Sequence, residues 1–114
     1  MSVKLNTRQV GDVTVIDISG RITLGEGSSA LRDILRDLTA KGNNKILLNL
    51  SDVSYIDSSG IGELVSGFTT VANQGGVVKL LSLTKRVQDL LQITKLYTVF
   101  EVFDDEAKAV QSFK

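Results

Sequence analysis

The chain has 114 residues, enough for one domain that buries about two thirds of its unfolded surface, and about half of its residues are apolar or glycine, which is a globular composition. The absence of Cys and His excludes disulfides, imidazole or thiolate metal sites, and Ser-His-Asp or Cys-His relays. Lys and Arg together number 13 and balance 13 Asp and Glu, so no basic field is expected to attract nucleic acid.

Membrane insertion and secretion are also not indicated. No apolar run approaches the roughly 18 residues of a membrane-spanning helix. The opening sequence MSVKLNTRQV lacks the charged and then apolar layout of a signal peptide. We therefore expect a cytoplasmic protein.

The first half of the chain predicts a hairpin, a helix and a buried strand. Residues 3–10 and 13–18 are rich in β-branched side chains and meet at a Gly-Asp turn signal. Apolar residues recur at helical spacing from Leu31 to Leu38, and the sequence Gly-Asn-Asn at 42–44 ends that helix. The mostly apolar run 45–50 has the length of a strand covered on both faces of a parallel sheet.

The second half predicts alternating helices and strands. Residues 61–71 carry apolar side chains at i, i+3, i+4, i+7 and i+10, which is typical of an amphipathic helix. A strand over 77–81, a helix capped by Thr84, a strand over 97–103 and a helix capped by Asp104 or Asp105 follow. The order β-β-α-β-α-β-α-β-α predicts an α/β domain with mostly parallel strands.

A glycine-rich segment before the first helix suggests two alternatives. Residues 25–30 (GEGSSA) match the dinucleotide-binding pattern GxGxxG/A. A chain of this length cannot hold two mononucleotide-binding halves, so a structural loop or a partner-contacting loop is favoured. Thr23, followed three residues later by Glu26, also forms a capping-box pattern.

A phospho-Asp receiver domain is a further candidate, because it shares this size and alternation. Its acidic residues and lysine would come from Asp12, Asp57 and Lys108. However, Asp12 falls in the hairpin turn, and Asp57 lies seven positions beyond Leu50, outside the expected strand. Lys108 falls inside the last helix, which also disfavours a receiver.

The densest signal is the segment 52–62 (DVSYIDSSGIG), between the central strand and the second helix. Function in α/β folds usually lies at such a carboxyl end of a strand. Asp57, Ser58 or Ser59 can cap the helix, whose first turn offers unpaired N–H groups to an anion. Gly60 and Gly62 each weaken a helix by about 0.5–1 kcal/mol relative to Ala. They would let another chain or a phosphate approach closely.

The run 56–62 (IDSSGIG) resembles the signature of the anti-sigma factor antagonists, which are bacterial STAS-domain proteins. The segments 48–53 (LNLSDV) and 20–22 (GRI) are also similar to that family. The similarity covers essentially the whole chain in length and element order. It implies one STAS domain over residues 1–114, with a four- or five-stranded mixed sheet flanked by helices.

The resemblance also implies a function. Ser58, the first Ser of DSSG, would be phosphorylated by an anti-sigma factor that is also an ATP-dependent serine kinase. Unphosphorylated members bind this anti-sigma factor and free the sigma factor for transcription, and a PPM-type serine phosphatase resets them. Such proteins are substrates and not enzymes. We expect no cofactor or metal, no direct binding of nucleic acid or membrane, and a monomer in the free state.

The expected partner contacts surround Ser58. They are Asp57, Ser59, Gly60, Ile61 and Gly62, with Thr23, Glu26 and Ser28 as further contacts. Two positions depart from the family pattern, because Thr23 and Asn49 stand where many members carry Asp. Some STAS domains act without phosphorylation, so a scaffold or transport-system subunit that only binds partners is the alternative function.

Overall fold

The computed structural model describes residues 3–114. Its strands are β1 (Val3–Val10), β2 (Val13–Ile22), β3 (Lys45–Ile56), β4 (Val77–Leu81) and β5 (Val102–Phe103). Its α-helices are α1 (Glu26–Ala40), α2 (Ser58–Asn73), α3 (Lys85–Ile93) and α4 (Glu106–Gln111), with a short 3-10 helix, η1 (Leu96–Thr98), before β5.

The strands form one mixed sheet in the order β1-β2-β3-β4-β5. β1 and β2 are antiparallel and pair through the hairpin expected at the Gly-Asp turn, where Gly11 has a φ of 62°. β2, β3, β4 and β5 are mutually parallel, and helical crossovers connect β2 to β3 and β3 to β4. The prediction of a mixed sheet flanked by helices is therefore confirmed.

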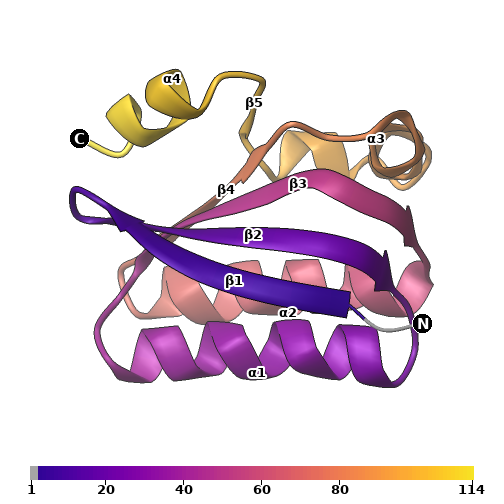
Figure 1. Cartoon of the computed structure of the whole chain (residues 1–114), viewed down its shortest axis with the longest axis horizontal. Helices are drawn as coiled ribbons and strands as arrows, with labels where there is room; N and C mark the ends of the chain where they lie inside the picture. Colours follow the sequence, from indigo (N-terminus) through magenta and orange to yellow (C-terminus); the bar gives the residue numbers. More distant parts are fainter. Residues whose placement is uncertain (1–2) are drawn as a thin grey trace.

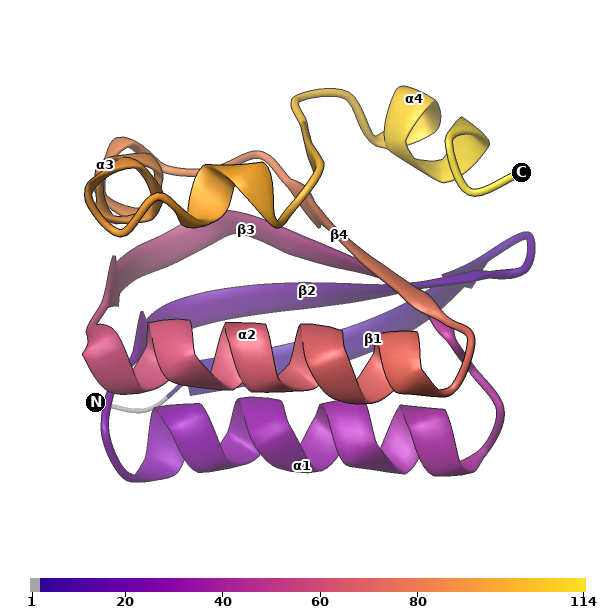
Figure 2. The ribbon, with the colours of Figure 1, turned by 180° about the vertical axis from the view of Figure 1, so that it is seen from behind.

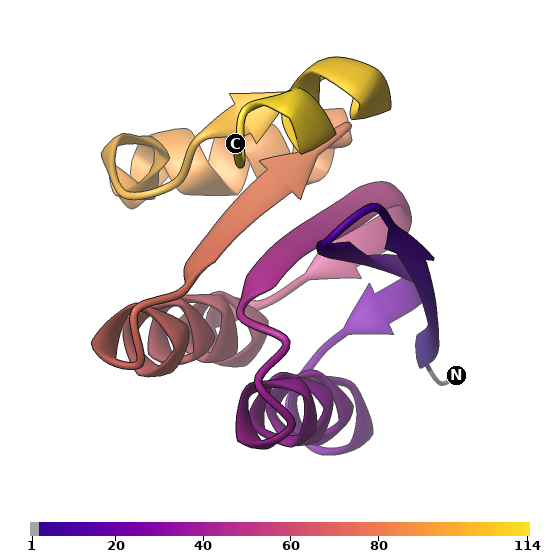
Figure 3. The same ribbon diagram turned by 90° about the vertical axis from the view of Figure 1, so that its left-hand side faces the viewer.

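Helices cover both faces of the sheet. α1 and α2 lie side by side on one face, and α3 and α4 lie on the other (Figures 1 and 2). The view along the sheet shows these layers end-on (Figure 3). The main core includes Ile16, Leu31, Leu48 and Leu64, and a smaller cluster forms around Ala109 of α4. No helix within residues 3–114 combines the length and apolar character needed to cross a membrane.

Three strand boundaries differ from those predicted, and the first is the end of β2, which lies at Ile22 and not at Ile18. β3 continues from Leu50 to Ile56, because Val53 and Ile56 stay buried and keep pairing with β2 across two register shifts. Asp57 therefore lies outside the strand, as predicted, but follows its last residue directly because the strand is longer than expected. The strand predicted over 97–103 is also wrong in its extent, since η1 occupies its first part and only Val102–Phe103 pairs with β4.

Two cations hold the C-terminal helix on the sheet. Arg8 of β1 donates hydrogen bonds to Asp17 of β2 and to Glu106 of α4, each with a shortest distance of 2.6 Å. The buried Lys79 of β4 donates to the carbonyl and hydroxyl oxygens of Ser112, at 3.0 and 2.9 Å. α4 is thus positioned by charge as well as by its apolar contacts.

The Arg8 bridge predicts an acid-sensitive contribution to stability. Hydrogen bonds from Arg8 hold the pKa values of Asp17 and Glu106 below their ordinary values. A carboxylate with a lowered folded-state pKa stabilises the fold above its unfolded-state pKa, and this contribution is lost as the pH falls through the folded-state pKa. We therefore expect the bridge to lose about 0.5–1 kcal/mol below about pH 4, a small value because its groups are partly exposed.

Urea denaturation at about pH 7 and about pH 3 measures this loss. The Arg8→Gln variant should lose less of its free energy of unfolding on acidification than the unaltered protein. Arg36→Gln, which changes an exposed arginine of α1, is the matched control and should behave like the unaltered protein. An equal acid loss in Arg8→Gln and the unaltered protein would contradict the assignment.

Candidate functional site

The candidate site is built around the carboxyl end of β2, which lies between the first turns of α1 and α2. A Cβ added to Gly27 of α1 would lie 2.7 Å from the Arg21 carbonyl oxygen. A Cβ added to Gly60 of α2 would lie 2.5 Å from the Ile22 carbonyl oxygen and 2.6 Å from Cγ1 of Ile56. Both helices therefore begin against the strand backbone, and we call this arrangement of Gly27, Ile22 and Gly60 the glycine joint.

Asp57 connects the elements of the glycine joint by hydrogen bonds. Its Oδ1 accepts a hydrogen bond from the Gly60 N–H and its Oδ2 accepts one from the Leu24 N–H, both at 3.0 Å. Its own N–H donates to the Ile22 carbonyl oxygen at 3.2 Å. The bond from Gly60, followed by that from Leu24, lowers the pKa of Asp57 below its ordinary value. Among the three residues predicted as caps of α2, Asp57 is the one that serves.

The two serines that follow Asp57 differ in exposure. Ser58 is the first residue of α2 and its side chain is exposed, whereas Ser59 is half-buried. Gly62, one turn further along, is exposed and has open space where a Cβ would stand. Ser58 thus presents a hydroxyl to solvent at the positive end of the α2 dipole, where added negative charge is favourable.

The structure buries three of the expected partner contacts. Gly60 and Ile61 face inward, so the role predicted for Gly60, close approach to another molecule, is replaced by internal packing. Ser28 is also buried, and its hydroxyl donates to the Gly25 carbonyl oxygen at 3.5 Å. These three residues pack beneath the candidate contact surface and are not part of it. Glu26 is exposed, so its side chain is accessible to a partner.

The glycine-rich segment at 25–30 has a structural explanation. Gly25, with a φ of 98°, is the N-cap of α1 and makes no side-chain capping bond, so the capping box predicted for Thr23 and Glu26 is wrong. Thr23 is half-buried and contributes its carbonyl oxygen, which accepts the Ser28 N–H at 3.0 Å. Turn geometry at Gly25 and packing at Gly27 account for both glycines without a dinucleotide.

The three residues considered for a receiver domain do not form one site. Asp12 lies in the hairpin turn and pairs with Lys45 at 2.6 Å. Lys108 lies on α4, and both carboxylate oxygens of Asp57 already accept backbone N–H groups. Asp12, Asp57 and Lys108 therefore do not form the acidic pair and lysine that a receiver domain needs.

A cationic-aromatic cluster at the same edge was not predicted. Arg21 of β2 lies over the ring of Tyr55 of β3, with its Cζ 4.7 Å from the ring centroid. Arg86 of α3 approaches the same ring at 4.5 Å. Both arginines are exposed, as is Leu24 in the loop after β2. The sequence signal was weak because it required knowing that β3 extends as far as Tyr55.

Comparison with known proteins identifies the class to which this fold and site belong. The chain belongs to the STAS domain family, whose pattern matches residues 4–109. It is 32% identical to the anti-sigma-B factor antagonist of Bacillus subtilis, over 97% of this chain and 100% of that protein. It is 31% identical to a putative anti-sigma factor antagonist of Thermotoga neapolitana, over 90% of both chains.

A solved structure extends this similarity to the fold. The crystal structure of a putative anti-sigma factor antagonist from Thermotoga maritima matches with a TM-score of 0.88 at 26% identity. The match covers 96% of this chain and 93% of the other. The family resemblance and the fold expected from the sequence are thus both confirmed.

Proposed function

We propose that this chain is an anti-sigma factor antagonist switched by phosphorylation of Ser58. In the unphosphorylated form it binds an anti-sigma factor that is also a serine kinase, and so frees a sigma factor. The observation that carries the proposal is the exposed Ser58 hydroxyl at the start of α2, beside an Asp57 whose carboxylate is fully engaged. The names of the relatives support the choice of partner.

The charge of the surface explains how phosphorylation would act. A phosphate on Ser58 adds about −1.5 to −2 charges at pH 7. The helix dipole and the solvent exposure of Ser58 let the fold accept this charge. A partner whose carboxylates approach Arg21 and Arg86 would be attracted before phosphorylation, and the phosphate would cancel most of that attraction. Binding, and not folding, is then the property that changes.

The contact surface proposed here combines exposed and half-buried residues near the glycine joint. Asp57, Ser58, Ser59 and Gly62 come from the start of α2, and Thr23 and Glu26 come from the start of α1. Arg21 and Leu24 extend it along the end of β2. In this proposal the chain is the substrate of the kinase and of a PPM-type phosphatase, and performs no catalysis itself.

The two departures from the family pattern bear unequally on this proposal. Asn49 donates to Asp17 at 2.8 Å and so belongs to the Arg8 bridge. About 20 Å of strand separates it from the start of α2. Thr23 lies within the proposed contact surface. Its missing carboxylate is the feature that favours the second candidate, a STAS scaffold that binds its partner without phosphorylation.

Phosphosite mapping decides between the two candidates. We expect the anti-sigma factor kinase from the source organism, with ATP and Mg²⁺, to add one phosphate, which peptide mass spectrometry places on Ser58. Ser59→Ala should still be phosphorylated, and Ser58→Ala should not. A main site at Ser59, or binding of the kinase without any phosphate transfer, would overturn the phosphorylation switch.

A further inference from the structure

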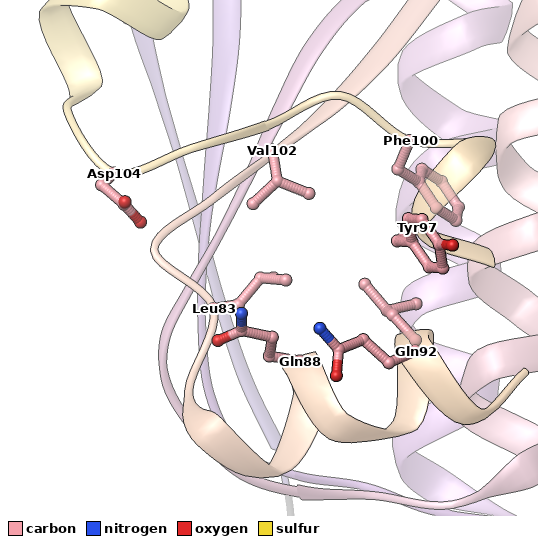
Figure 4. Close-up of a pocket in the computed structure, with 8 residues that line it drawn as sticks. Leu83, Gln88, Gln92, Tyr97, Phe100, Val102 and Asp104 are labelled. Atoms are coloured by element: carbon pink, nitrogen blue, oxygen red, sulfur yellow. The ribbon is translucent and has the colours of Figure 1, made fainter. Parts of the chain in front are cut away.

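A cavity of about 390 Å³ lies on the other face of the sheet, between α3, η1 and the segment that leads into β5 (Figure 4). Its volume falls within the range of about 300–1,000 Å³ that is typical of small-molecule sites. Its lining includes the side chains of Gln88, Gln92, Tyr97, Phe100, Val102 and Asp104. None of them takes part in the proposed partner surface.

The two ends of this cavity differ in chemistry. Tyr97 and Phe100 lie at one end, and Asp104 lies at the other (Figure 4). Phe100 is buried and packs edge-on against Phe68, with 5.3 Å between the ring centroids, so the aromatic end is anchored in the core. The side chains of Gln88 and Gln92 project from α3 into the space between the ends (Figure 4).

The charged side chain that lines the cavity is negative. Asp104 is the only ionisable acid or base among the lining residues apart from the Tyr97 phenol. It is exposed and takes part in none of the ion pairs formed within residues 3–114. The neighbouring Asp105 is engaged as the N-cap of α4. A cation is therefore the ligand charge that complements this end.

Exposed apolar side chains also concentrate here. Tyr97 and Val102, which line the cavity, are exposed, as are Ile93 and Val99, which lie in the same short stretch of the chain. Only Leu24 and Val77 among the other large apolar residues of the described chain are similarly exposed. Clustered apolar exposure is a mark of a binding surface, whereas isolated exposed residues are ordinary.

We propose that this cavity binds a small arylalkylamine. The aromatic ring would lie against Tyr97 and Phe100, and the ammonium group would donate to the Asp104 carboxylate. The carboxamides of Gln88 and Gln92 would form hydrogen bonds with polar groups that the ligand carries between its ring and its amine. This inference is independent of the function proposed for Ser58.

Four matched probes separate the contributions of ring and charge. Phenylpropylamine carries both, phenylpropanol and phenylpropionate replace the amine by a neutral and an anionic group, and butylamine lacks the ring. Titrations followed by amide ¹H–¹⁵N spectra should show saturable shifts at residues 83–104 for phenylpropylamine, with a dissociation constant of about 1 mM for a ligand of this size. Phenylpropanol should bind at least fivefold more weakly, and the other two more weakly still.

Variants at exposed positions test the same geometry without disturbing the core. Asp104→Asn should weaken phenylpropylamine at least fivefold while changing phenylpropanol less than twofold. Gln88→Phe should fill the cavity and abolish binding of both, and Asp33→Asn on α1 should alter neither. The proposal is overturned if phenylpropylamine gives no saturable shift, if its shifts map elsewhere, or if phenylpropionate binds as tightly.

Discussion

Replacing Gly60 with alanine is expected to lower the free energy of unfolding by about 2–3 kcal/mol, the upper part of the range for overpacking a core. The new Cβ would meet the Ile22 carbonyl oxygen at 2.5 Å, and a backbone atom within a paired strand cannot move aside cheaply. For a domain of this size the corresponding fall in melting temperature is about 8–15 °C. Thermal melts followed by circular dichroism, with urea denaturation, measure both quantities.

Gly62→Ala is the matched control for this substitution. Gly62 lies on the same helix two residues later, and a Cβ there would meet nothing within 4 Å. Alanine should stabilise the helix at this position by about 0.5–1 kcal/mol, because it is the better helix former. Equal effects of the two substitutions would show that helix propensity, and not the glycine joint, determines the response.

Ser58→Asp is expected to weaken binding to the anti-sigma factor kinase at least tenfold, which corresponds to about 1.4 kcal/mol. The added carboxylate imitates part of the phosphate charge at the surface proposed to meet the partner. Stability should change little, because the helix dipole favours the charge by about 0.3–1 kcal/mol and repulsion from Asp57 offsets that gain. Calorimetric titration and thermal melts of the same samples separate binding from folding.

Two further variants make this test specific. Ser58→Ala should keep the affinity of the unaltered protein and lose only the ability to be switched off. Ser66→Asp places the same charge on an exposed position two turns along α2 and should cost much less affinity. If Ser58→Asp binds as tightly as the unaltered protein, charge at this position is not the switch, and the scaffold function becomes the better proposal.

Local patterns were sufficient to predict most of the fold. The hairpin, α1, α2 and β4 follow from periodicity and turn residues that lie within each segment, and the structure confirms them. The length of β3 could not be predicted in the same way. Its last part contains Asp52 and Ser54, which are typical of loops, and it stays extended because it pairs with β2 and buries Val53 and Ile56.

In the candidate site, too, the features set by neighbouring residues could be predicted, and those set by distant contacts could not. Asp57 was one of three predicted caps because capping depends on neighbours in the sequence. The reason for Gly60 lies in its contact with the Ile22 backbone, which belongs to a distant strand, and no local pattern encodes it. The stacking of Arg21 and Arg86 on Tyr55 joins three separate elements and was invisible for the same reason.

The glycine joint also has a consequence for how such proteins can diverge. Packing leaves no room for a side chain at Gly27 or Gly60. By contrast, the side chains of Arg21, Leu24 and Glu26 are exposed and contribute little to the stability of the fold. Substitutions at these exposed positions can change the charge or size of the side chain at small cost to the stability of the fold. Duplicated copies within one genome could therefore acquire separate partners, each excluding the others by mismatched charge, while the geometry at the start of α2 stays the same.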